Sequence, residues 1–184
     1  NEFLLNMEND GYEIKHSEKN NNYRLRDPEL YFKHALTWSK ISSGDFSMRF
    51  APSGLLFDIA GCCAFNIKKW EYVLGLLNSS TGSRFLSLIS ATLNYEVEHI
   101  KSIPILFDSS KESSIGDSVA RNVAISSQDW NSYETSWDFT EFPLVHFHEF
   151  LGSLEQAYKS WKAECNKRFY QLKANEEELN RIFA

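Results

Sequence analysis

Residues 68–104, KKWEYVLGLLNSSTGSRFLSLISATLNYEVEHIKSIP, decide the fold of this chain, because they join two helical segments to a strand-like ending. Four apolar side chains of the first segment recur at the spacing of one helical face: Trp70, Val73, Leu74 and Leu77. The sequence Asn-Ser-Ser at 78–80 then offers side chains that compete with the helix for backbone hydrogen bonds. We therefore predict a helix that ends near Asn78.

The rest of this stretch predicts a second helix and then a strand. The apolar face of a helix that begins near Thr81 is formed by Phe85, Leu86, Leu88 and Ile89. Pro104 disfavours helix in the residues before it and suits an edge strand. We therefore expect residues 100–105 to be extended around this proline.

Upstream residues predict further strands. Residues 36–41 and 46–50 alternate in polarity and are separated by Ser-Ser-Gly-Asp at 42–45, which indicates a β-hairpin. Residues 55–59, LLFDI, form a short apolar run between turn signals and predict a buried strand. Asp27 followed by Pro28 predicts the start of a short helix, with Asp27 as the capping residue.

The C-terminal part of the sequence predicts a linker and a long helix. Residues 108–128 are polar and rich in Ser, which is typical of a linker, with one short helix at 115–124. The aromatic block at 129–144 is expected to pack irregularly against the core. From residue 146 apolar side chains recur every three or four positions, which predicts an unbroken helix to residue 173, about 42 Å long. Asn175 with Glu178 predicts the start of another helix.

The composition predicts a soluble, cytoplasmic protein with a sizeable core. The chain has 184 residues, of which 42% are hydrophobic, and its apolar runs are shorter than the ~20 residues of a membrane-spanning helix. The three cysteines form neither a disulfide framework nor a zinc motif, so we expect free thiols. Because the chain starts without Met and ends within an apparent helix, we expect it to be a piece of a longer protein.

Charge is distributed unevenly along the chain. The net charge of −6 argues against a uniformly basic nucleic-acid-binding protein. Residues 15–49, however, contain seven basic and four acidic side chains, a balance of +3, whereas residues 109–184 contain eight basic and twelve acidic side chains, a balance of −4. Any contact with DNA must therefore come from a local patch, although such an imbalance is also common on ordinary solvated surfaces.

Three motifs carry a resemblance to a known family. They are VLGLLNSSTGSRFLSLISATLNYEVEHIKSIPI at 73–105, LTWSKISSGDFSMRFAPSGLLFDIAG at 36–61 and DWNSYETSWDFTEFPLV at 129–145. In this order they resemble the C-terminal target-recognition and spacer region of PglX-type adenine-specific DNA methyltransferases, which belong to bacterial phage-exclusion (BREX) systems and are related to type IIG restriction-modification enzymes. The resemblance covers nearly the whole chain, from about residue 23 to residue 183.

The resemblance implies a mixed α/β (α+β) fold with three parts. Residues 1–108 would form a compact, mixed-sheet target recognition domain that binds double-stranded DNA. Residues 109–145 would be a linker and aromatic-rich packing segment, and residues 146–184 a helical spacer. The apolar seam of the predicted helix, from residue 147 to residue 172, is longer than a small domain can cover. We therefore expect part of it to pack on the aromatic block around Trp130, Trp137 and Phe139, and the rest to meet another chain or the catalytic domain of the parent protein.

The resemblance also assigns candidate contacts with DNA. The resemblance places two parts of the hairpin over the major groove. The turn supplies Lys40, Ser42 and Ser43, and the second strand supplies Arg49. Phosphate contacts are assigned to Arg24, Arg26, Lys68 and Lys69, the last two at the start of a predicted helix. Trp38 could stack on DNA, but its spacing from Leu36 favours a core position.

The sequence offers few signs of catalysis. Adenine methyltransferases need a glycine-rich loop for the methyl donor and an Asn/Asp-Pro-Pro-aromatic loop for the flipped base, and neither motif is present. A nuclease motif and a GxSxG nucleophile elbow are also absent. His146, His148 and His99 are better explained as surface or packing residues than as metal ligands. We therefore expect no catalytic residue and no cofactor in this fragment, and S-adenosylmethionine is implied only for the parent enzyme.

An alternative function follows from the acidic balance and the long helix. In that alternative the chain is a protein-interaction scaffold that docks through its C-terminal helix onto another defence-system subunit or a phage inhibitor. A positive concave face around Lys40, Arg49 and Lys68 would favour DNA recognition, whereas a uniformly acidic face would favour the scaffold.

Overall fold

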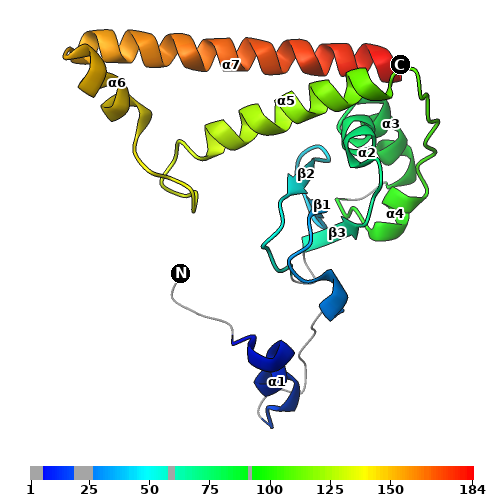
Figure 1. Cartoon of the computed structure of the whole chain (residues 1–184). Coiled ribbons are helices and arrows are strands. Elements are labelled where there is room, and N and C mark those ends of the chain that lie inside the picture. Colours follow the sequence, from blue (N-terminus) through cyan, green and yellow to red (C-terminus); the bar gives the residue numbers. More distant parts are fainter. Residues whose placement is uncertain (1–5, 19–26, 58–60, 91–92) are drawn as a thin grey trace.

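The computed structural model describes residues 6–18, 27–57, 61–90 and 93–184, with only the backbone at 148–151. Its elements are α1 (Glu8–His16), η1 (Pro28–Leu30), β1 (Ala35–Ser39), β2 (Met48–Ala51), β3 (Gly61–Phe65), α2 (Trp70–Leu77), α3 (Ser80–Ile89), α4 (Val97–Lys101), α5 (Glu112–Trp130), α6 (Pro143–Leu151) and α7 (Leu154–Phe183). The expected mixed α/β class with a long C-terminal helix is confirmed. Figure 1 shows α2, α3 and α4 on one side of the sheet, while α5 and α7 run side by side.

The sheet has the order β2-β1-β3 and is antiparallel throughout, whereas a mixed sheet was expected. The predicted hairpin is confirmed, with Trp38 of β1 opposite Met48 of β2. On the other side Trp38 lies opposite Cys62 of β3. Since side chains alternate between the two faces of a strand, Leu36 and Trp38 both face the core, and each is 1% exposed.

The third strand lies further along the chain than the sequence predicts. Residues 55–57 are not in a strand, and Leu55 and Leu56 are 45% and 39% exposed. Residues 58 and 59 of the predicted strand lie outside the described residues. The strand that pairs with β1 is instead β3, whose small residues Cys62 and Cys63 lie opposite Trp38 and Thr37. The prediction of a strand at 55–57 from apolar character alone was therefore wrong.

The predicted α2 and α3 are confirmed, but Leu88 of the expected apolar face of α3 is 82% exposed, whereas Leu86 is buried. α2 is followed by Asn78, and Ser79 caps α3 because its Oγ accepts a hydrogen bond from Gly82 N at 3.2 Å. The helices meet so closely at Gly82 that an added Cβ would lie 2.3 Å from Leu76 O. Only glycine fits this contact without a backbone shift.

Residues 97–101 form the helix α4, although a strand around Pro104 was predicted. A capping box closes the N-terminus of α4: the side chain of Glu96 bonds the backbone of His99, and the side chain of His99 bonds the backbone of Glu96. Pro104 follows the helix end and is in no strand, while Ile103 is buried in the core. The helix ends before Ile103, the residue whose conformation Pro104 restricts, so the proline is compatible with α4.

Most of the expected linker at 108–128 belongs to α5, a 19-residue helix that continues to Trp130. Ile115 and Val119 lie four residues apart on one helical face, and both are buried where α5 contacts α2. Val123 continues this face and packs against the same core. The many serines of α5 occupy mostly its exposed side, which is why the composition resembled a linker.

The long C-terminal helix has different bounds from those predicted. A break at Gly152, whose φ is +67°, separates α6 from α7. α7 then continues for 30 residues through Asn175, where a new helix was predicted. Asn175 is 6% exposed, and its Nδ2 donates to Asn122 Oδ1 of α5 at 2.7 Å. Its role is therefore a contact between helices and not a cap.

Much of the aromatic block is exposed, although it was expected to cover the core. Trp130 and Trp137 are 59% and 87% exposed, so they do not receive the apolar seam of α7. Phe142 does contact α7, with its ring centroid 5.3 Å from that of Trp161. The first part of α7 lies beside α6 instead (Figure 1), and its later part contacts α5, for example where Asn175 bonds Asn122.

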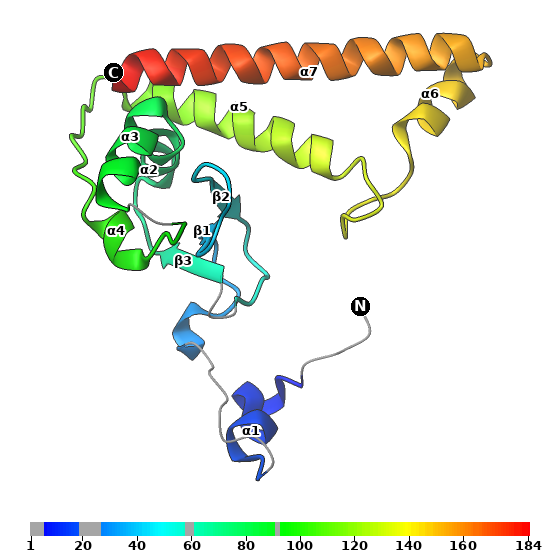
Figure 2. The ribbon, with the colours of Figure 1, turned by 180° about the vertical axis from the view of Figure 1, so that it is seen from behind.

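The C-terminal end of α7 returns to the core beside α2 and α3, as both views show (Figures 1 and 2). Phe183 O accepts a hydrogen bond from Thr81 Oγ1 at 2.9 Å, and Asn180 Oδ1 accepts one from Ser80 N at 2.8 Å. A Cβ added at Gly75 of α2 would lie 3.3 Å from Phe183 Cε2. The last turns of the long helix are thus part of the core.

Replacing Gly82 by Ala should lower the free energy of unfolding by about 3 kcal/mol, because the new methyl group would overlap the backbone of α2. Gly116→Ala is the matched control, since no atom lies within 4 Å of a Cβ there and the site is inside α5. Alanine's higher helix propensity should raise stability there by up to about 1 kcal/mol. Chemical denaturation measures both changes, and equal values would contradict the packing described.

Candidate nucleic-acid interface

The turn after β1 holds three of the candidate residues. Ser42 N donates to Leu93 O at 3.0 Å, and Tyr95 N donates to Lys40 O at 2.7 Å, so the turn is fixed to residues 93–95. Lys40 Nζ lies 3.1 Å from Glu96 Oε1. Ser43 is exposed beside them. The backbone here is well anchored, while the polar side chains remain accessible.

Arg49 lies on β2, an edge strand, and its side chain is exposed. Its Nη2 donates to Ser39 Oγ at 3.1 Å, which links it to the residue before Lys40. Arg49 lies opposite Thr37, and Thr37 lies opposite Cys63, so these side chains form a row on the face away from the core. The structure therefore brings Arg49 close to the turn that carries Lys40.

Asn78 positions β2 relative to α2, a role that the sequence did not reveal. Its Oδ1 accepts a hydrogen bond from Met48 N at 2.9 Å, and its Nδ2 donates to Met48 O at 2.9 Å. These bonds fix the end of α2 to the strand that carries Arg49. The sequence predicted only that Asn78 ends the helix, because an Asn at a helix end gives no sign of a partner thirty residues away.

Lys68 and Lys69 lie at the other end of the sheet. They follow β3, whose last residue Phe65 pairs with Ala35 at the start of β1, whereas Lys40 follows the end of β1. Lys69 Nζ is 2.9 Å from Glu112 Oε2 and 3.5 Å from the centroid of a phenylalanine ring, that of Phe107. Lys68 is exposed.

The remaining candidates do not add to this surface. Arg24 and Arg26 lie outside the described residues. Trp38 is a core residue, as favoured from the sequence, and its Nε1 donates to Tyr95 O at 2.9 Å. A buried indole with its N–H already bonded does not stack on a base.

Acidic groups accompany the positive charges at both ends of the sheet. Glu96 pairs with Lys40, Glu112 pairs with Lys69, and Asp45 is exposed in the hairpin turn. Both ion pairs are nearly half-exposed, and such pairs contribute at most about 1 kcal/mol. A phosphate group can therefore replace either carboxylate at little cost.

Three further properties concern the described part of the chain. Within it no cluster of three or more His, Cys, Asp or Glu side chains is arranged to hold a metal ion. Cys62, Cys63 and Cys165 form no disulfide bond with one another. His146 Nδ1 lies 2.8 Å from Glu141 Oε1, and His99 caps α4. None of the helices described is both long and apolar enough to cross a membrane.

Comparison with known proteins shows that the chain is similar to a segment of two adenine-specific methyltransferases. It is 36% identical over 190 residues to the adenine-specific methyltransferase PglX of Lacticaseibacillus casei (strain Zhang), covering 98% of this chain and 16% of that protein. It is 32% identical over 185 residues to the adenine-specific methyltransferase BrxX of Escherichia coli O9:H4 (strain HS), covering 98% and 14%. No family model matches the chain. The chain is thus homologous, over nearly its whole length, to one segment of adenine-specific methyltransferases and spans about a sixth of their length.

Proposed function

We propose that this chain is the DNA-recognition segment of an adenine-N6 DNA methyltransferase in a BREX phage-defence or restriction-modification system. The observation that carries the proposal is the similarity of 98% of the chain to two proteins named adenine-specific methyltransferases. In this proposal the fragment is non-catalytic. The methyl-transfer residues and the S-adenosylmethionine site then belong to another part of the parent protein.

The β1–β2 hairpin is the element best suited to read DNA. The major groove of B-DNA admits a two-stranded β-ribbon, and β1 with β2 forms such a ribbon at the edge of the sheet. Arg49 offers an exposed guanidinium that is already oriented by Ser39. Arginine is the side chain most suited to bind the O6 and N7 atoms of guanine. We assign base contact to Arg49.

The other candidates are assigned to the DNA backbone. Lys40, Ser42 and Ser43 lie together in the turn beside Arg49, where they can contact the phosphates that flank the groove. Lys68 and Lys69 lie at the opposite end of the sheet and would contact a more distant phosphate. Such contacts fix the orientation of the protein and carry no sequence information.

The proposal implies partners besides double-stranded DNA. These are the catalytic domain of the same parent chain and, in a cytoplasmic defence complex, other system subunits or a phage inhibitor. The division into recognition domain (1–108), linker (109–145) and spacer (146–184) remains a prediction. Because Phe183 and Leu179 pack in the core with α2, we propose that the recognition unit also includes the end of α7. The scaffold alternative is not favoured, since both relatives are named as methyltransferases.

Arg49→Ala should weaken binding to the preferred duplex. Selection from a pool of random-sequence duplexes provides that duplex, and fluorescence anisotropy measures its affinity. Loss of one bidentate base contact costs about 1–3 kcal/mol, or roughly 5- to 150-fold in affinity. Affinity for an unselected duplex should change much less, so the specificity ratio should fall.

Arg181→Ala is the matched control for this experiment. Arg181 is exposed on α7 and pairs with Glu178, so its removal should leave both affinities unchanged. If the chain binds no duplex, or if Arg49→Ala and Arg181→Ala behave alike, the assignment of Arg49 is wrong.

The isolated chain should not bind S-adenosylmethionine. Titration calorimetry with the donor, and with its demethylated product, should give no saturable heat, because the glycine-rich cofactor loop is absent from the sequence. Saturable binding of either compound by the 184-residue chain would contradict the placement of the catalytic site in another part of the parent protein.

A further inference from the structure

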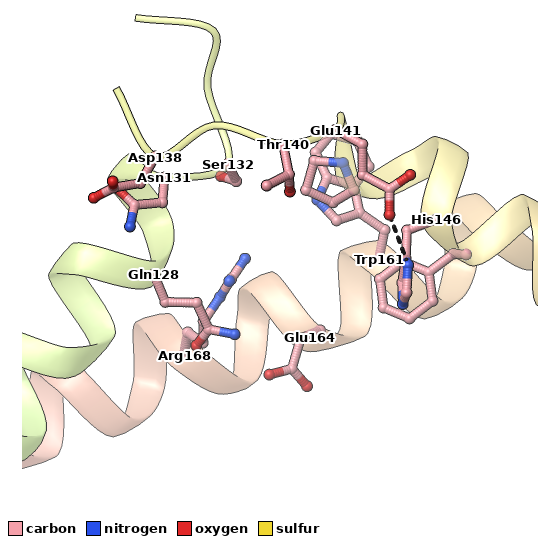
Figure 3. A pocket seen from close by; sticks show the side chains of 12 residues that line it. Gln128, Asn131, Ser132, Asp138, Thr140, Glu141, His146, Trp161, Glu164 and Arg168 are labelled. Atoms are coloured by element: carbon pink, nitrogen blue, oxygen red, sulfur yellow. Dashed lines mark hydrogen bonds and ion pairs between the residues drawn. The ribbon is translucent and has the colours of Figure 1, made fainter. Parts of the chain in front are cut away.

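A pocket of about 610 Å³ lies far from the β1–β2 hairpin, between the end of α5, the connection to α6, and α7. Figure 3 shows Gln128 and Asn131 on the α5 side, His146 on the α6 side, and Arg168 and Trp161 rising from α7. The guanidinium of Arg168 points into this space, toward the connection that carries Ser132 and Thr140.

The side chain of Arg168 is buried but poorly satisfied. It is only 11% exposed, and its Nε is buried without a hydrogen-bond partner. Its Nη2 donates to Cys165 Sγ at 3.4 Å, which is a weak acceptor. The nearest carboxylate oxygen, Asp129 Oδ1, is 4.0 Å from Nη2 and too far for a hydrogen bond.

A buried guanidinium with this arrangement is costly for the folded chain. Removing a charge from water is unfavourable unless good acceptors replace the lost hydration. Five N–H donors in a planar fork match the two oxygens of a carboxylate or phosphate. The guanidinium end of Arg168 points into the pocket (Figure 3), so a bound oxyanion could accept hydrogen bonds from its Nη atoms, while the buried Nε would stay unpaired.

We propose that this pocket binds the carboxylate group of a ligand with an apolar or aromatic body, and that Arg168 is its principal contact. This site does not depend on the proposed DNA recognition. Three acidic side chains also line the pocket, those of Asp138, Glu141 and Glu164, and they disfavour a highly charged anion. These charges repel a phosphate, which carries about −1.5 to −2 at neutral pH, more strongly than a carboxylate.

The remaining lining supports both parts of such a ligand. Trp161, Phe147 and Pro143 provide an apolar wall against which a ring can pack. Asn131 accepts a hydrogen bond from Ser136 Oγ through its Oδ1 at 2.8 Å, which makes its amide nitrogen the end that can donate to a carboxylate.

Three probes with the same ring test the head group. Benzoate, benzamide and phenyl phosphate are titrated into the 184-residue chain, and the ¹H–¹⁵N resonances of the Arg168 Nε–H and the Trp161 indole are followed. Benzoate should shift both resonances saturably. Benzamide should bind about tenfold more weakly because it lacks the charge-assisted hydrogen bonds, and phenyl phosphate should also bind more weakly than benzoate.

Variants of two arginines on α7 test the contact. Arg168→Gln should abolish the shift of the Trp161 indole, and Arg168→Lys should weaken binding about tenfold because the planar fork is lost. Arg181→Gln, on the exposed part of the same helix, should leave binding unchanged. Circular dichroism confirms folding, and if Arg168→Gln does not fold, Arg168→Lys decides.

Four outcomes would overturn the proposal. They are no saturable shift with benzoate, binding of benzamide equal to that of benzoate, tighter binding of phenyl phosphate, and unchanged binding by both Arg168 variants. The source of the carboxylate is then distinguished with N-acetyl-glutamyl-phenylalanine amide. Tighter binding than benzoate supports a carboxylate presented by a protein segment, and weaker binding supports a free small molecule.

Discussion

Three helices meet at Gly75 of α2, and the rest of the structure depends on this contact. A Cβ at Gly75 would lie 3.1 Å from Val119 Cγ2 of α5 and 3.3 Å from Phe183 Cε2 of α7. The absence of a side chain lets α5 and α7, which follow α2 by dozens of residues, reach the same short helix. Ile115 and Leu179 are buried around it, and each such side chain contributes about 1.5–3 kcal/mol.

This junction also fixes the orientation of the hairpin assigned to DNA. α2 contacts β2 through Asn78 at one end and through Trp70 at the other, where the rings of Trp70 and Phe50 stack at 4.3 Å. Arg49 lies between Met48 and Phe50, the two residues held in this way. A single short helix therefore sets the position of the hairpin relative to the long helix, which favours a recognition surface of fixed geometry.

The sequence predicted the elements whose causes are local. The hairpin follows from alternation and a turn sequence, α2 follows from its apolar spacing and ends as expected at Asn78, and α3 follows from its own apolar face. The core position of Trp38 followed from the polarity pattern of one strand. The candidate residues Lys40, Ser42 and Ser43 share one turn because they are neighbours in sequence.

Predictions failed where distant residues decide the structure. α5 resembled a linker because its serines outnumber Ile115 and Val119, whose burial depends on α2. The spacing of Asn175 and Glu178 resembled a helix cap. The sequence could not show that the partner of Asn175 is Asn122, which lies on another helix. The pocket at Arg168 could not be predicted either, since it requires α5, α6 and α7 to converge.

Native-state hydrogen exchange tests the central claim that the end of α7 belongs to the core formed with α2. Helix ends ordinarily open most easily, so the amides of the last two turns of α7 would exchange fast in an independent spacer. Our account predicts that the amides of Leu179 and Ile182 exchange as slowly as those of Leu76 and Leu77 in α2. Fast exchange at the end of α7, with α2 still protected, would contradict it.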